Sequence, residues 1–532
     1  MATPFANLSW ENRFVEHFPG DPEIRNFTRR VANVCYSEVR PTPVRGPRLL
    51  GWADHFADEL GIAKPGPDDA ASLELLAGNR VLPSMRPYAA RYGGHQFGHW
   101  AGQLGDGRAI TLGEAVFPRH GRQEFQLKGP GKTPYSRHAD GRAVLRSSLR
   151  EFLCSEAMHF LGVPTTRALS LVATGEQVVR DMFYDGNPVP EPGAIVCRVA
   201  PTFLRFGNFE ILAASEENGL LKRLADYLIA EYYPAFDLRD PDVYGQLLDE
   251  IARRTADMIV HWQRVGFVHG VMNTDNMSAL GLTIDYGPYG WLEPYDPSWT
   301  PNTTDAGQGR YRYGYQPAIA LWNLGCLAGA LMPLVENEDR VQQSLGLYRD
   351  TFHASYDRMI ASKLGLPSVA SDDDQKLVAD LFTLMQSAET DYTLFFRGLS
   401  DWPAKGDAAD AGAFWEHVGP AFYAEDAHES GLRTQWQEWA RRYARRVGQE
   451  AATDDERGRA MKRVNPKYVL RNYLAQNAIT AAAERGDLGV LERLMRVLKT
   501  PYDELPGEED LAQRRPEWAR SAPGCSALSC SS

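Results

Sequence analysis

Two short motifs, HGVMNTDN at 269–276 and IDYG at 284–287, decide the fold expected of this chain. The first places Asp275 and Asn276 in a polar loop behind a short apolar segment, and the second places Asp285 behind an apolar pair. An Asn/Asp-rich turn between strands accounts for the first motif alone. It does not account for the Asp-Tyr-Gly that follows after eight intervening residues. Together the motifs predict a site built from oxygen ligands.

The two motifs are similar to the catalytic and metal-binding loops of protein kinases, apart from one position. In kinases one loop supplies an Asp base and an Asn ligand, and a later Asp-Phe-Gly supplies a second metal ligand. Asn276 and Asp285 match the two ligands, and hard oxygen donors of this type suit Mg²⁺. The base expected two residues after His269 is missing, because Val271 stands there. Asp275 is the loop carboxylate that can replace it.

A lysine and a glutamate upstream form a second pair typical of kinases. Lys128 ends a strand-like segment, and Glu151 lies in a helix expected from about 142 to 161, where apolar residues recur every three or four positions. A strand lysine held by a helix glutamate positions nucleotide phosphates in kinases. The plainer alternative is a surface lysine and an exposed glutamate.

Residues 92–114 carry seven glycines, which allow backbone amides to approach a phosphate closely. Gly105, Gly107 and Arg108 are the candidates for nucleotide contact, although a bulged hairpin needs glycines as well. His95 and His99 have the spacing of a zinc helix, but the surrounding glycines argue against a helix and so against a metal there.

Four further residues have both a structural and a ligand-binding interpretation. Asp140-Gly141 fits a turn with a helix cap as well as a ligand contact. Arg198 and Arg205 fit phosphate recognition as well as salt bridges between domains. Their spacing is compatible with one face of a helix or with the two ends of a hairpin loop.

The chain divides into four regions by composition and periodicity. We expect an N-terminal extension at 1–85 that packs on the core, and a β-rich nucleotide-binding lobe at 86–200. A larger helical lobe with the catalytic and metal-binding loops follows at 201–500, and a tail with Cys525 and Cys530 occupies 501–532. The predicted fold class is therefore α+β, with a small β-rich lobe before a helical one.

Composition excludes several classes of protein. The 532 residues include 57 Lys+Arg and 69 Asp+Glu, for a net charge of −12, which argues against a nucleic-acid or anionic-membrane partner. The apolar stretch 318–335 contains Asn323 and Pro333 and is expected to be a buried helix rather than a membrane span. No leader pattern is evident and six scattered cysteines form no scaffold, so a cytoplasmic location is expected.

The strings GGHQFGHWAGQLGDGRA, QLKGPGKTPYSRHADGRAVLRSSLREFL and HGVMNTDNMSALGLTIDYGP are long and unusual. Through them the chain resembles the selenoprotein O family of pseudokinase-like protein adenylyltransferases over most of its length. The resemblance implies a two-lobed protein-kinase-like fold that binds ATP in the reverse orientation. AMP would then pass to Ser, Thr or Tyr hydroxyls of protein substrates, and pyrophosphate would be released.

The resemblance also implies a role for each candidate residue. Asp275 would accept a proton, and Asn276 and Asp285 would bind Mg²⁺, with Mn²⁺ as an alternative. Glu151 would position Lys128. The residues that would contact ATP are Gly105, Gly107, Arg108, Lys128, Asp140, Gly141, Arg198, Arg205 and Asp285.

The resemblance extends to the C-terminus, where Cys530 occupies the position of selenocysteine in eukaryotic relatives. Cys530 is either a redox switch, paired with Cys525 or a distant cysteine, or an exposed thiol. Two other functions stay open for the whole chain. One is ordinary γ-phosphoryl transfer by a protein kinase, which Val271 argues against, and the other is a non-catalytic nucleotide-binding scaffold.

Overall fold

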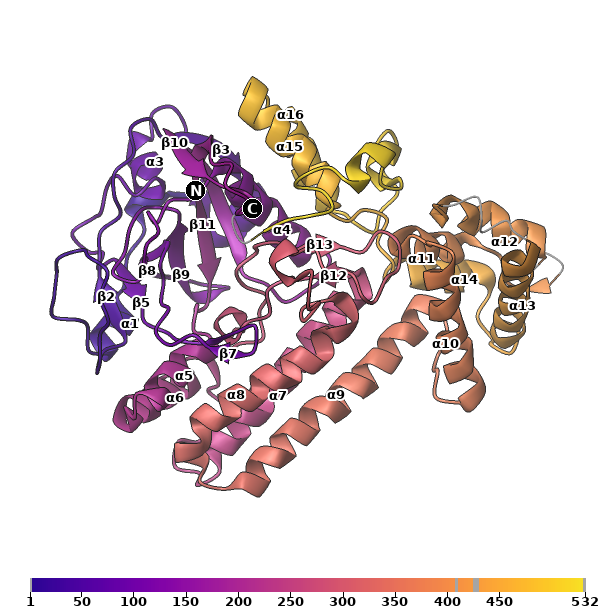
Figure 1. Ribbon diagram of the computed structural model, residues 1–532, viewed down its shortest axis with the longest axis horizontal. Helices are drawn as coiled ribbons and strands as arrows, with labels where there is room; N and C mark the ends of the chain where they lie inside the picture. The colour runs from indigo at the N-terminus through magenta and orange to yellow at the C-terminus, as the bar shows by residue number, and fades with distance from the viewer. Residues whose placement is uncertain (1, 407–409, 424–429, 530–532) are drawn as a thin grey trace.

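The computed structural model describes residues 2–406, 410–423 and 430–529. A β-sheet with its flanking loops forms one end of the molecule, and long helices extend from it toward a second group of helices at the other end (Figure 1). This arrangement confirms the expected mixture of a β-rich part and a larger helical part.

The main sheet has seven strands, and all of its pairings are antiparallel. The strands of the described residues are β1 (Thr3–Pro4), β2 (Tyr36–Glu38), β3 (Arg48–Trp52), β4 (Ile62–Ala63), β5 (Tyr88–Ala90), β6 (His95–Gln96), β7 (His99–Trp100), β8 (Ala109–Phe117), β9 (Gly121–Lys128), β10 (Arg167–Arg180), β11 (Val189–Ala200), β12 (Phe267–Val268) and β13 (Gly290–Trp291). The order in the main sheet is β2-β5-β8-β9-β11-β10-β3. Both edge strands, β2 and β3, come from the first 85 residues, so this region extends the sheet on both sides.

Helices make up most of the chain after residue 200. The helices of the described residues are α1 (Arg13–His17), α2 (Asp54–Leu60), α3 (Ala70–Leu76), α4 (Leu145–Phe160), α5 (Phe206–Ala214), α6 (Asn218–Tyr232), α7 (Val243–Val265), α8 (Gln316–Val335), α9 (Glu338–Leu364), α10 (Asp372–Ser387), α11 (Tyr392–Asp401), α12 (Ala411–Val418), α13 (Ser430–Val447), α14 (Asp454–Lys462), α15 (Asn472–Arg485) and α16 (Gly489–Leu498). In Figure 1, α7, α8 and α9 run alongside one another away from the sheet, and contacts join each pair of them.

Helix α4 connects the sheet to the rest of the molecule. It packs on β10 and β11, and α15 and α16 contact it as well, so nearly all of its residues are buried. The helix begins at Leu145, three residues later than expected. After Gly141, whose φ is +71°, Arg142 and Val144 form bridges with Pro130 and Gly193, so this part of the chain is extended rather than helical.

The apolar stretch around 318–335 forms most of α8, as expected. By length and composition, residues Tyr313–Val335 are one segment able to cross a membrane, with 44% of its most apolar window buried. The helix packs against α5, α7 and α9, so one of its faces lies in the protein core. This packing supports the expectation of a core helix.

The C-terminal segment is held against the core as far as the structure describes it. The Leu528 backbone accepts a hydrogen bond from the Thr303 amide at 2.7 Å and donates one to the Pro301 carbonyl at 2.9 Å. Cys525 is buried and free, and burial raises the pKa of its thiol to about 11. Cys530 lies outside the described residues, so its proposed redox role stays a prediction.

Glu124 of β9 gives the fold a predictable pH dependence. Its side chain is 3% exposed, and burial, together with the nearby Glu114, raises its pKa to about 8. Above its ordinary pKa of about 4.5, Glu124 is ionised in the unfolded state but stays protonated in the folded state until the pH reaches about 8. The free energy of unfolding should therefore fall as the pH rises from about 4.5 to 8. The slope from this group is about 1.4 kcal/mol per pH unit.

We expect Glu124→Gln to remove this contribution. Denaturant unfolding at pH 5 and pH 8 should show a smaller loss of stability with rising pH in the variant than in the parent. Glu23→Gln serves as the matched control because Glu23 is a surface glutamate paired with Arg25. Equal pH dependence of the parent and Glu124→Gln would contradict the assignment.

Candidate active site

A cavity of about 700 Å³ lies between the sheet and the loops that follow β12. Such a volume is typical of small-molecule sites. The cavity is lined by ten of the twelve residues singled out from the sequence, which are Gly105, Gly107, Arg108, Lys128, Asp140, Gly141, Arg198, Asp275, Asn276 and Asp285. The other two, Glu151 and Arg205, lie behind this lining and contact it through ion pairs.

Lys128 and Glu151 meet as expected. Lys128 is the last residue of β9, and its Nζ lies 2.7 Å from Glu151 Oε2 on α4. The contact forms because α4 packs across the sheet and presents Glu151 to the end of the lysine strand. Both side chains are buried, so the pair fixes the lysine at the cavity wall.

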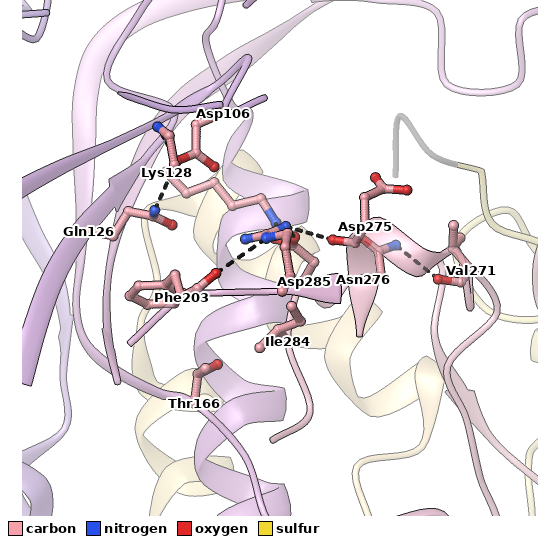
Figure 2. A network of polar contacts seen from close by, with 12 residues as sticks. Asp106, Gln126, Lys128, Thr166, Phe203, Val271, Asp275, Asn276, Ile284 and Asp285 are labelled. Atoms are coloured by element: carbon pink, nitrogen blue, oxygen red, sulfur yellow. Dashed lines mark hydrogen bonds and ion pairs between the residues drawn. The ribbon is translucent and has the colours of Figure 1, made fainter. Parts of the chain in front are cut away.

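The Asp285 carboxylate joins the cations of the site. It lies 3.7 Å from Lys128 Nζ and 2.5 Å from Arg205 Nη1, and it also pairs with Arg198. Figure 2 shows Asp285 at the centre of the network, between Lys128 and the Asp275–Asn276 loop. Although burial opposes ionisation, Arg205, Arg198 and Lys128 hold the pKa of Asp285 well below its usual range. The carboxylate is therefore ionised at neutral pH.

Asp275 has a different environment. Its side chain is 8% exposed, Gln96 Nε2 donates to its Oδ2 at 3.3 Å, and its buried Oδ1 has no hydrogen-bond partner among the described residues. Burial raises the pKa of Asp275 to about 7, while Arg205 opposes the shift. A carboxyl group that titrates near neutrality and has an unused oxygen is suited to accepting a proton.

The residues expected to bind a metal fit that role by their donor atoms. Asn276 Nδ2 donates to the Val271 carbonyl at 2.9 Å, which leaves the amide oxygen of Asn276 as its remaining donor atom toward a cation (Figure 2). Asp285 stays ionised, as a ligating carboxylate must. An amide oxygen and a carboxylate are hard ligands of the kind that Mg²⁺ accepts.

The two arginines reach the site by a route that the sequence did not predict. Arg198 lies on β11 and Arg205 at the start of α5, so they share neither a helix face nor a hairpin loop. They converge because only a short segment separates the end of β11 from the start of α5, and Arg205 pairs there with Ser278. Arg205 also donates to the Asp275 carbonyl at 2.9 Å and thereby supports both aspartates of the site.

Asp140 is not a helix cap, since the residue before α4 is Val144. Its carboxylate instead binds Arg180 of β10, with the shorter contact at 2.6 Å. This pair connects the Asp140-Gly141 turn to the β10–β11 hairpin at the cavity rim. The helix cap was therefore wrong, whereas Asp140 and Gly141 do form a bend in the chain, and the ligand contact stays a prediction.

Gln96 is a site residue that sequence reasoning missed. It lies on the β6–β7 hairpin, where the backbone amide of the adjacent His95 donates to Thr274 Oγ1 at 2.7 Å. The His95 ring contacts Glu210 at 2.7 Å. The prediction that His95 and His99 do not form a zinc helix is confirmed, because they lie on two short strands. The glycine run was the available signal, since it lets this hairpin approach the Asp275 loop.

Comparisons with known proteins show the family to which the chain belongs. A family model described as protein adenylyltransferase SelO matches residues 23–499. The chain belongs to the SelO family. A protein nucleotidyltransferase YdiU of Nitrosospira multiformis is 60% identical over 98% of this chain and 96% of its own length. Those of Azoarcus sp. and Rhodopirellula baltica are 55% and 53% identical over 99% of both chains. As a SelO protein, the chain is a nucleotidyltransferase.

We predict that Glu151→Gln weakens nucleotide binding by about tenfold or more. A hydrogen bond between charged groups contributes about 1.5–3 kcal/mol, and this variant loses the carboxylate that holds Lys128. Calorimetric titration with ATP measures the effect.

The matched control is Glu156→Gln on the same helix. Glu156 is equally buried and bonds Arg167 at 2.7 Å, outside the cavity lining. A loss of ATP affinity of the same size in both variants would mean that the effect comes from damage to α4 rather than from Lys128.

Proposed function

We propose that this SelO-family nucleotidyltransferase is a protein adenylyltransferase with a two-lobed, kinase-like fold. It transfers AMP from ATP to Ser, Thr or Tyr hydroxyls of protein substrates. The observation that carries the proposal is the buried Asp275 carboxyl with an unused oxygen, in a cavity where Val271 occupies the usual position of the kinase base. The cytoplasmic location expected from the sequence stays a prediction.

In the proposed reaction, the acceptor hydroxyl oxygen forms a bond to the α-phosphorus of ATP. The bond from this phosphorus to the oxygen bridging the α- and β-phosphates breaks, and pyrophosphate leaves with the electron pair. The hydroxyl proton passes to Asp275, whose pKa of about 7 provides the basic form in a large fraction of molecules at neutral pH. ATP lies in the reverse of the kinase orientation, so that the α-phosphate faces the acceptor.

The cations of the site would bind and orient the triphosphate. Lys128 and Arg198 line the cavity, and Arg205 supports them from behind. Asn276 and Asp285 would hold Mg²⁺, or Mn²⁺, which neutralises phosphate charge when bound. The fixed positive charges act in a largely buried site, where they need little reorganisation as charge develops on the leaving pyrophosphate. Gly105, Gly107, Arg108, Asp140 and Gly141 would form the rest of the nucleotide contact.

Labelled ATP tests the proposal directly. The purified enzyme, alone and with a protein extract, is incubated with Mg²⁺ and either α-³²P or γ-³²P ATP. We expect label on protein from the α-position alone. Asp275→Ala should reduce it by about 100-fold or more, the usual range for losing a general base.

Asp237→Ala is the matched control, because Asp237 is a surface aspartate whose side chain is 54% exposed. It should label protein as the parent does. Label from the γ-position alone would make the enzyme a kinase, and no label from either position would favour a nucleotide-binding scaffold. Either result would overturn the proposal.

A further inference from the structure

Three histidines and a glutamate meet outside the nucleotide cavity, at a place where α2, α4 and the β8–β9 turn come together. His55 and Glu59 lie one turn apart on α2, His159 lies in the last turn of α4, and His120 precedes β9. None of the four lines the nucleotide cavity. The cluster therefore has no part in the nucleotide site described above.

The distances within the cluster are close to those of a metal site. His55 Nδ1 lies 3.0 Å from Glu59 Oε1, and the ligand atoms of His55, Glu59 and His159 all lie within 4.8 Å of one another. His120 Nε2 lies 3.6 Å from the second oxygen of Glu59. Two ligands of one tetrahedral zinc ion lie about 3.3 Å apart, because Zn–N and Zn–O bonds are about 2.0–2.2 Å long.

His159 distinguishes this cluster from an ordinary surface ion pair. A helical His–Glu pair accounts for His55 and Glu59 without a metal. It does not account for His159, whose ring nitrogens have no hydrogen-bond partner in the described part of the chain. The ring instead lies beside His55, with centroids 6.4 Å apart, and against Phe160 at 5.0 Å.

The neighbouring Arg167 does not prevent the cluster from binding a cation. Arg167 Nη1 lies 3.6 Å from Glu59, but the same guanidinium makes two hydrogen bonds of 2.7 Å to Glu156. Arg167 also lies over the Phe56 ring, which fixes its position. Its charge is thus mostly balanced by Glu156, and Glu59 remains the carboxylate that faces the histidines.

We propose that His55, Glu59 and His159 bind a Zn²⁺ ion, with His120 beside them at the Glu59 carboxylate. Imidazole nitrogens with one carboxylate form a ligand set typical of zinc, whereas Mg²⁺ prefers oxygen ligands alone. His159 lies on the same helix as Glu151, eight residues later. A bound ion would tie the end of α4 to α2 and thereby restrict movement of the helix that positions Lys128.

Zinc titration of the full-length enzyme in excess Mg²⁺ tests the site, because Mg²⁺ occupies oxygen-only sites. We expect one equivalent of zinc chloride to bind, and His55→Ala and His159→Gln each to weaken this binding at least tenfold. His99→Ala is the matched control, since His99 is an exposed histidine on the distant β6–β7 hairpin. It should bind zinc as the parent does.

Cobalt substitution of the parent gives a readout that does not depend on the stability of any variant. The parent loaded with Co²⁺ should show the intense visible absorption of a tetrahedral site, and His159→Gln should lose it. A parent that binds no equivalent of zinc, or variants that bind it as well as the parent, would overturn the proposal.

Discussion

The ionised carboxylate of Asp285, held among Lys128, Arg198 and Arg205, is the interaction on which the rest of the structure depends. Burying a charge is costly unless partners surround it, and removing any one of them leaves the others uncompensated. The partners come from β9, β11 and the start of α5, so the network holds the sheet, the first helix after it and the Asp-Tyr-Gly loop in one arrangement. With Glu151 included, three cations face two carboxylates, which leaves a positive site suited to phosphate.

The same network explains why the two aspartates of the site differ chemically. Asp285 has three cations close to its oxygens and stays ionised. Within the described residues, the Asp275 carboxyl accepts one long side-chain hydrogen bond, from Gln96, and burial dominates its pKa. Arg205 touches both, through the Asp285 side chain and the Asp275 backbone. Their environments push the two pKa values apart, so one site holds both an ionised carboxylate and a carboxyl group that titrates near neutrality.

Features encoded locally could be predicted from the sequence, and features made by distant pairing could not. The helix α4 and the polar loop at 273–276 could be predicted because helix faces and loops are determined by residues that are close together in the sequence. The edge strands β2 and β3 were missed because short strands gain their stability from partners far along the chain. Gln96 was missed for the same reason, since it contacts a residue 179 positions away. The sequence thus singled out residues that the fold gathers around one cavity, but not the positions on β11 and α5 from which Arg198 and Arg205 reach it.

The covering of α4 by α15 and α16 has a consequence for how the chain folds during synthesis. Roughly 300 residues separate the end of α4 from the start of α15, and a ribosome adds about 5–20 residues per second. For a period of roughly 15–60 s, the nascent chain therefore has its sheet but not the two helices that cover α4. An apolar surface stays open during that time and is a natural binding site for chaperones. Helix α4, which carries Glu151, is then among the last parts of the site to reach its final packing. A chain whose synthesis stops before α15 would have the strands of the sheet but would lack the two helices that cover α4.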